Sequence, residues 1–104
     1  MKYRLLGRSG MRVSELCLGT MTFGADTFGA PQEECRKVFD AFVHAGGNFF
    51  DSANMYAQGN SERILGEFIA HDRARFVIAT KYTHNIRADD ANAGAISARI
   101  WFRH

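Results

Sequence analysis

The residues of this chain best suited to chemistry are Asp51, Tyr56 and Lys81, which lie at or just after the ends of predicted strands. A tyrosine phenol has a pKa of about 10, so by itself it donates a proton slowly near neutral pH. A neighbouring ammonium stabilises the phenolate, and a carboxylate keeps that lysine protonated and holds its direction. Together the three side chains could protonate a carbonyl oxygen while a hydride reaches the carbonyl carbon.

Each of these residues also has an ordinary structural interpretation. Asp51 could cap backbone N–H groups at the start of a loop, Lys81 could be a solvated charge, and Tyr56 could pack as a loop aromatic. Their placement favours the catalytic interpretation, because the carboxyl ends of neighbouring parallel strands converge on one rim, where active sites lie. Thr20 ends an earlier predicted strand and would reach the same rim.

Hydrophobic patterning predicts the elements that must bring these residues together. Residues 2–6 and 12–14 flank a glycine-containing turn and are typical of a β-hairpin. The apolar runs 16–21, 48–51 and 76–80 are short enough to be buried strands. Two amphipathic helices are predicted between these strands by apolar residues at helical spacing: Cys35, Val38, Phe39, Phe42 and Val43 in the first, and Ile64, Leu65, Phe68 and Ile69 in the second.

The helix boundaries follow from the residues that flank these patterns. Pro31 suits the first turn of the first helix, and the Gly46–Gly47 pair ends it. Asn60 or Ser61 can cap the second helix, and Asn48 is interpreted as a turn residue. Because strands alternate with amphipathic helices, the sequence predicts an α/β fold with parallel pairing, ordered hairpin, strand, helix, strand, helix, strand.

Composition narrows the class of protein. The chain has 104 residues, 46% of them hydrophobic, which predicts one globular domain. A net charge of +2 without a basic block argues against nucleic acid and anionic membranes as partners. No apolar run is typical of a signal peptide or a membrane span, so we expect a soluble, cytoplasmic protein. Cys17 and Cys35 have no metal-ligand spacing and are interpreted as reduced, buried apolar residues, and no metal site is expected.

Several stretches of the chain resemble the aldo-keto reductase family. Residues 3–14 look like the family's N-terminal hairpin, and Leu18–Gly24 looks like its first barrel strand and loop. The most specific stretch is Ala45–Tyr56 followed by Gly59–Gly66, and Ala79–Lys81 matches the third strand. The resemblance implies a (β/α)8 TIM barrel that reduces aldehydes or ketones to alcohols with NADPH.

The resemblance also implies roles for individual residues. Tyr56 would be the general acid, with Asp51 and Lys81 as the partners that tune it. Gly19, Thr20 and Met21, together with Asp51, match positions that approach the nicotinamide end of the cofactor. The expected partner is therefore a small carbonyl substrate, and no protein partner is indicated.

The chain departs from the family in its length and at its end. A complete barrel needs about 250 residues, so we expect only a hairpin and three strands of a partial barrel over residues 1–94. The family's histidine after the fourth strand has no counterpart, since neither His84 nor His104 matches it. Residues 95–104 are expected to be a non-homologous tail. The stretch Ala95–Ile100 can arise when codons typical of the family are read one base late, which indicates a frameshift or truncation near Gly94. We expect this fragment to be inactive alone.

Two alternatives stay open at this point. The same scaffold could serve as a non-catalytic binding or regulatory module, as in potassium-channel β subunits that resemble the same family. A small receiver-like signalling domain could instead use Asp51 as its phosphoacceptor, with Thr20 and Lys81 nearby. Such receivers need an acidic pair after the first strand, which Gly19–Met21 does not supply.

Overall fold

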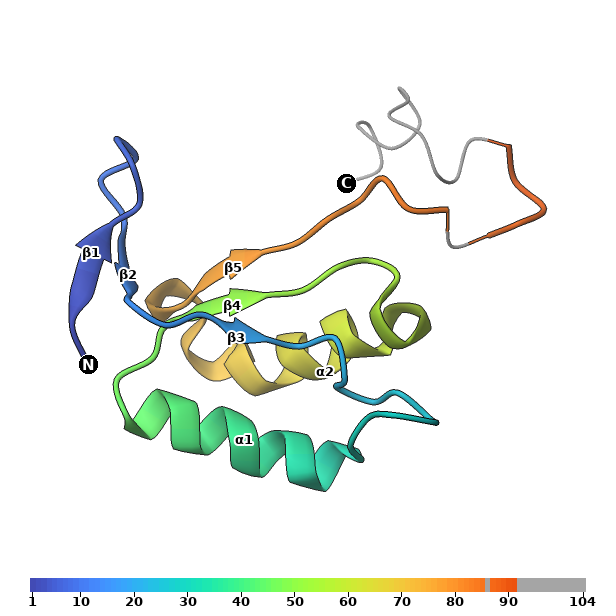
Figure 1. The fold of residues 1–104 in the computed structure, drawn as a ribbon, viewed down its shortest axis with the longest axis horizontal. Helices are drawn as coiled ribbons and strands as arrows, with labels where there is room; N and C mark the ends of the chain where they lie inside the picture. Colours follow the sequence, from blue (N-terminus) through green and yellow to red (C-terminus); the bar gives the residue numbers. More distant parts are fainter. Residues whose placement is uncertain (86, 92–104) are drawn as a thin grey trace.

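The structure is a computed structural model that describes residues 1–85 and 87–91 (Figure 1). The tail expected over residues 95–104 and its boundary at 94 lie outside the described residues. The elements, in chain order, are β1 (Tyr3–Leu5), β2 (Arg12–Ser14), β3 (Leu18–Gly19), α1 (Gln32–His44), β4 (Phe49–Asp51), η1 (Tyr56–Gly59), α2 (Asn60–Ile69), η2 (Ala70–Arg75) and β5 (Val77–Ala79).

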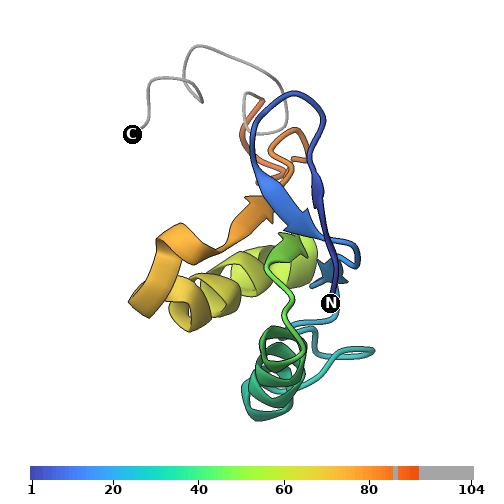
Figure 2. The ribbon, with the colours of Figure 1, turned by 90° about the vertical axis from the view of Figure 1, so that its left-hand side faces the viewer.

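Strands β3, β4 and β5 form a parallel sheet in sequence order, as predicted. Its register pairs Gly19 with Asp51 and Asp51 with Ala79, so that the three strands end at the same edge. Helices α1 and α2 lie against one face of this sheet, and the view from the hairpin side shows both helices on that same side (Figures 1 and 2). Within the described part of the chain the sheet is open and does not close on itself.

An aromatic cluster fills the space between the sheet and the helices. The Phe39 ring from α1 stacks on Phe50 from β4, with centroids 5.3 Å apart, and it also contacts Phe68 from α2 at 5.3 Å. The ring of Phe76 lies 5.7 Å from Phe50 and completes the cluster. All four side chains are buried, so the apolar periodicity of the sequence correctly identified the packed faces.

Two details of the predicted elements differ. Val38 is 45% exposed although it belongs to the predicted apolar stripe of α1. It lies at the edge of that stripe, whereas Cys35 and Phe39 lie at its centre and are buried. Strand β3 is also shorter than the predicted run 16–21, because the chain turns away after it, with the amide of Phe23 donating to the Thr20 carbonyl at 3.1 Å.

The predicted hairpin is confirmed. Asn48, which the sequence analysis interpreted as a turn residue, attaches this hairpin to the sheet. Strands β1 and β2 pair antiparallel, with Tyr3 opposite Ser14. Asn48, just before β4, accepts from the Ser14 amide at 2.7 Å and donates to the Arg12 carbonyl at 3.0 Å. The amide of Asn48 donates to the Ser14 hydroxyl at 3.2 Å, and the Tyr3 hydroxyl donates to the Gly46 carbonyl. Asn48 is therefore a clamp between the hairpin and the sheet.

Candidate active site

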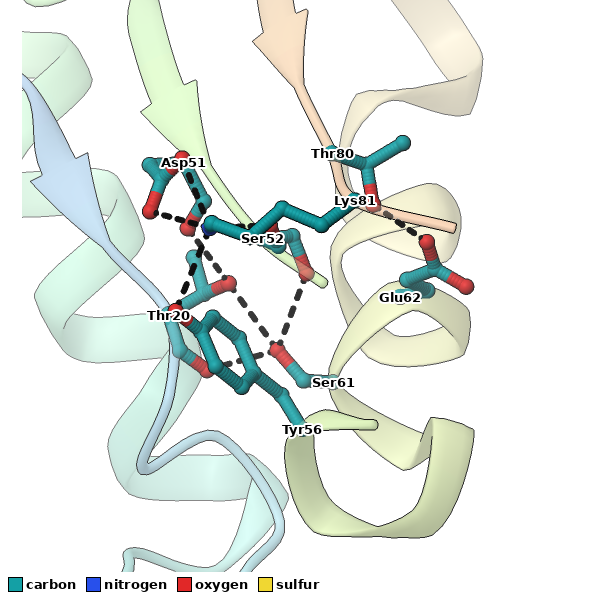
Figure 3. Close-up of polar contacts among 8 residues, drawn as sticks. All are labelled: Thr20, Asp51, Ser52, Tyr56, Ser61, Glu62, Thr80 and Lys81. Carbon is teal, nitrogen blue, oxygen red and sulfur yellow. Dashed lines mark hydrogen bonds and ion pairs between the residues drawn. The ribbon is translucent and has the colours of Figure 1, made fainter. Parts of the chain in front are cut away.

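The candidate site lies at the edge where the parallel strands end. Asp51 is the last residue of β4, and Lys81 comes two residues after β5. Because Asp51 pairs with Ala79, the segment that follows β5 carries the lysine to the carboxylate. Tyr56 begins η1, and its phenol turns back toward the same point (Figure 3). The structure thus brings together the three residues that the sequence predicted as a catalytic set.

The ammonium of Lys81 is the centre of the arrangement. It donates to both carboxylate oxygens of Asp51, Oδ1 at 3.1 Å and Oδ2 at 2.9 Å, and to the Ser52 carbonyl at 2.9 Å. Its third partner residue is Tyr56, whose hydroxyl lies at 3.2 Å (Figure 3). An ammonium has N–H donors for three directions, so these groups satisfy it and leave it in one orientation.

The electrostatics of this contact favour a charged lysine. The hydrogen bonds that Lys81 donates, to Asp51 first and to Tyr56 second, raise the pKa of Lys81 above its ordinary value, against a smaller opposing effect of desolvation. The lysine donates to the phenol oxygen, so the phenol's own proton is left for another acceptor. Side chains of Asp51 and Lys81 are 40% and 51% exposed, and a ligand can therefore reach them in this structure.

The predicted cofactor residues occupy two different environments. Gly19 is exposed opposite Asp51, and a side chain at its position would meet nothing within 4 Å. Met21, two residues further along the chain, is 51% exposed. Thr20 is fully buried: its hydroxyl and its amide both donate to the Asp51 carbonyl at 3.0 Å. Its polar groups are therefore engaged inside the protein.

Sequence reasoning missed the two serine hydroxyls behind the site, those of Ser52 and Ser61. Ser61 was expected only as a possible helix cap, yet the cap residue is Gly59, and Ser61 lies inside the first turn of α2. The Ser61 hydroxyl instead contacts Thr20, with 2.6 Å to its carbonyl and 2.9 Å to its hydroxyl, and lies 3.4 Å from the Ser52 hydroxyl. A serine near a helix start has the same local signal in either role, so only the tertiary contacts distinguish them.

The two cysteines differ, contrary to the expectation that both are buried. Cys35 is buried, with its thiol donating to the Ala30 carbonyl at 3.3 Å. Cys17 is exposed, two residues before Gly19 on β3. Its pKa is raised by partial burial first and by the negative charge of Asp51 second, while Lys81 lowers it. The pKa of Cys17 therefore depends on the charges of the site. In residues 1–85 and 87–91 no cluster of three or more metal-ligating side chains occurs.

A hollow of about 330 Å³ lies between the loop after β3 and the loop after β4, where Met55 and Ala57 line it but Tyr56 does not. Apolar groups of Phe28 and Met55 line it, and Asp26 and Gln58 add polar groups. The hollow is open to solvent in this structure. Separately, no helix among the described residues is long and apolar enough to cross a membrane.

Comparison with known proteins supports the family resemblance that the sequence motifs indicate. The model of the aldo/keto reductase family matches residues 15–100. Norsolorinic acid reductase of Aspergillus flavus is 46% identical over 89 residues, covering 78% of this chain and 23% of that protein. The oxidoreductase YrpG of Bacillus subtilis is 41% identical over 101 residues, covering 90% of this chain and 29% of that protein.

Solved structures agree in fold. An aldo-keto reductase from Bacillus halodurans, in its holo form, superposes with a TM-score of 0.74 at 32% identity, covering 88% of this chain and 29% of that one. A putative aldo-keto reductase from Pseudomonas aeruginosa gives a TM-score of 0.66 at 36% identity, with 75% and 30% covered. The chain thus spans about a quarter of the length of the curated relatives it matches.

Proposed function

Because the chain belongs to the aldo/keto reductase family, we propose that Tyr56, Lys81 and Asp51 form the proton-donating group of an NADPH-dependent reductase of aldehydes or ketones. The observation that carries this proposal is the contact of the Lys81 ammonium with both the Asp51 carboxylate and the Tyr56 hydroxyl. The sheet and helices described above would form the first part of a (β/α)8 barrel, whose active sites lie at the carboxyl ends of the strands.

The proton step follows from the direction of these hydrogen bonds. The phenol of Tyr56 gives its proton to the carbonyl oxygen of the substrate, and the carbonyl becomes an alcohol when hydride reaches its carbon. The negative charge left on the phenol oxygen lies 3.2 Å from the Lys81 ammonium, which stabilises it. The Asp51 carboxylate holds the ammonium charged and pointed at the phenol.

The residues around Gly19 fit a planar cofactor ring at this edge. Gly19 leaves open space where a side chain would stand, Asp51 lies opposite it on β4, and the exposed Met21 follows two residues further along the chain. NADPH would supply the hydride when bound. Thr20 was expected to contact the cofactor, and since it is fully buried we assign it a supporting position behind Gly19 and Asp51.

Activity should require more of the barrel than the described residues contain. A complete barrel has eight parallel strands, and the described residues supply a three-stranded parallel sheet. We therefore expect the isolated chain to oxidise no NADPH in the presence of a reactive aldehyde. Turnover by the isolated chain would overturn this part of the proposal.

A fusion tests the catalytic residues in a closed barrel. In it, this chain replaces the matching segment of the Bacillus halodurans reductase, and NADPH oxidation with an aldehyde is followed by absorbance. Tyr56→Phe should lower kcat by at least about 10²-fold while NADPH binding persists, because only the transferable proton is removed. Tyr3→Phe is the matched control, since it also removes a hydrogen-bonded phenol hydroxyl, but in the hairpin. Full turnover by the Tyr56→Phe fusion would remove Tyr56 from this role.

The same assay addresses the alternatives. A non-catalytic binding module would give a folded fusion that binds NADPH, by fluorescence titration, and reduces no aldehyde. The receiver-like alternative is not supported, because the chain belongs to a family of oxidoreductases.

A further inference from the structure

We propose that the buried hydroxyls of Thr20, Ser52 and Ser61 form a positioning cluster that fixes the Tyr56 loop against the Asp51–Lys81 pair. Ser61 is its central member. The inference rests on the proposed function only for its effect on catalysis. Its structural content, the placement of one side chain against another, can be measured without any activity.

The contacts of the cluster form one continuous chain of hydrogen bonds. Ser52 and Ser61 are 3.4 Å apart, and Ser61 Oγ lies 2.6 Å from the Thr20 carbonyl (Figure 3). The Thr20 hydroxyl then donates to the Asp51 carbonyl at 3.0 Å. Each hydroxyl has one proton to donate, and the order Ser52 to Ser61, Ser61 to Thr20 and Thr20 to Asp51 uses each proton once. The cluster is thus internally satisfied and has one consistent direction.

The elements joined by this chain are the ones that carry the site. Thr20 follows β3, Ser52 follows β4, and Ser61 lies in the first turn of α2. That turn is also attached to β5, because the Thr80 hydroxyl donates to Glu62 (Figure 3). Since Thr20, Ser52 and Ser61 are all buried, water does not compete for these bonds. The start of α2 is therefore fixed relative to all three strand ends.

Tyr56 lies on the loop that this cluster closes at its base. The loop leaves at Ser52, whose amide donates to the Ala79 carbonyl of β5 at 2.8 Å, and returns at Ser61. Within the loop, the Asn54 amide donates to the Lys81 carbonyl at 2.9 Å, just after β5. Directly after Tyr56, Ala57 and Gln58 have φ of 50° and 58°, a left-handed conformation that residues other than glycine rarely adopt. Such a conformation persists when the surrounding structure determines it, and anchored ends provide this. Loosening Ser61 should therefore let the phenol move away from Lys81.

The test measures the contact between Tyr56 and Lys81 by NMR in the 104-residue chain. The Lys81 ammonium lies 4.9 Å from the Tyr56 ring centroid, so the neighbouring methylene protons should show ring-current shifts and cross-peaks to that ring. Ser61→Ala and Thr20→Val should each reduce these cross-peaks at least twofold. The double variant should add little to Ser61→Ala, because the Ser61 hydroxyl makes both bonds to Thr20 and its loss already breaks them.

Matched variants separate positioning from loss of packing. Thr20→Ser keeps the hydroxyl and loses a methyl group, so it should retain the cross-peaks. Thr20→Val keeps the shape of the side chain but loses the hydroxyl, so it should show the reduced cross-peaks. Ser9→Ala removes a hydroxyl that donates to a carbonyl at 2.6 Å in the exposed hairpin turn, and it should change nothing at Tyr56. If Ser61→Ala does not fold, the comparison of Thr20→Val with Thr20→Ser decides whether the hydroxyl cluster positions Tyr56. Unchanged cross-peaks in folded Thr20→Val would overturn the positioning role.

Kinetics of the fusion separate this inference from the proposed function. In an active fusion, Ser61→Ala should lower kcat about 10- to 100-fold with little change in KM, because a small misplacement of the acid slows proton transfer. Loss of the NMR contact with unchanged kcat would refute the catalytic consequence. An inactive wild-type fusion would refute the proposed function and leave the NMR result to decide the positioning.

Discussion

Asn48→Ala should separate the hairpin from the sheet at a cost that can be worked out from the contacts. The hairpin strands bury little apolar surface, since Val13 is their one buried hydrophobic side chain among the described residues. Its attachment therefore depends on polar contacts, and Asn48 makes two of them with its side chain, to the Ser14 amide at 2.7 Å and to the Arg12 carbonyl at 3.0 Å.

The two contacts contribute unequally. Ser14 is only 2% exposed, so its amide would lose its partner without gaining water, which costs about 1–3 kcal/mol. Arg12 is exposed, and water can replace the side-chain amide at its carbonyl for about 0.5 kcal/mol. The free energy of unfolding should fall by about 1.5–3.5 kcal/mol in total, and Tm by about 6–28 °C for a domain of this size.

Urea unfolding of the 104-residue chain, followed by circular dichroism, measures the loss, and hydrogen exchange of the Ser14 amide locates it. Asn85→Ala is the matched control, because Asn85 also accepts a backbone N–H, from Arg87 at 2.8 Å, but in an exposed loop. The control should change stability by less than about 0.5 kcal/mol. Equal stability of the two variants, or a protected Ser14 amide in Asn48→Ala, would refute the clamp.

Two further predictions concern the packing of glycines and the charge of the site. Gly47→Ala should destabilise by about 1–3 kcal/mol in the same urea assay, because the new methyl group would lie 2.3 Å from the Phe42 ring. Gly66→Ala, inside α2 with nothing within 4 Å, should stabilise by about 0.5–1 kcal/mol, and the same sign for both would contradict the packing. Asp51→Asn should speed alkylation of Cys17, measured by mass spectrometry at constant pH, because losing the carboxylate charge lowers the pKa of that thiol. A slower reaction would show that Asp51 does not act on Cys17.

Local patterns in the sequence were sufficient for the elements. The 3.6-residue spacing of Phe39 and its neighbours, and the short apolar runs that became β4 and β5, depend on residues adjacent in the chain. The meeting of Asp51 and Lys81 was also predictable, because both follow parallel strands and such strands must end at a common edge. Val38 shows the limit of this reasoning, since a residue at the edge of an apolar stripe is buried only if a neighbouring element covers it.

The amino-acid sequence by itself determined where helices and strands form, how they alternate, and which charged side chains reach the rim. Only the tertiary structure decided that Ser61 bonds to Thr20 rather than capping its helix, and that Asn48 holds the hairpin. These contacts join residues separated by 41 and 34 positions. A hydroxyl or amide group has the same local preferences in a turn, a cap or a clamp. Its partner is selected by the register of the strands and the seating of the helices, which exist only once the chain has packed.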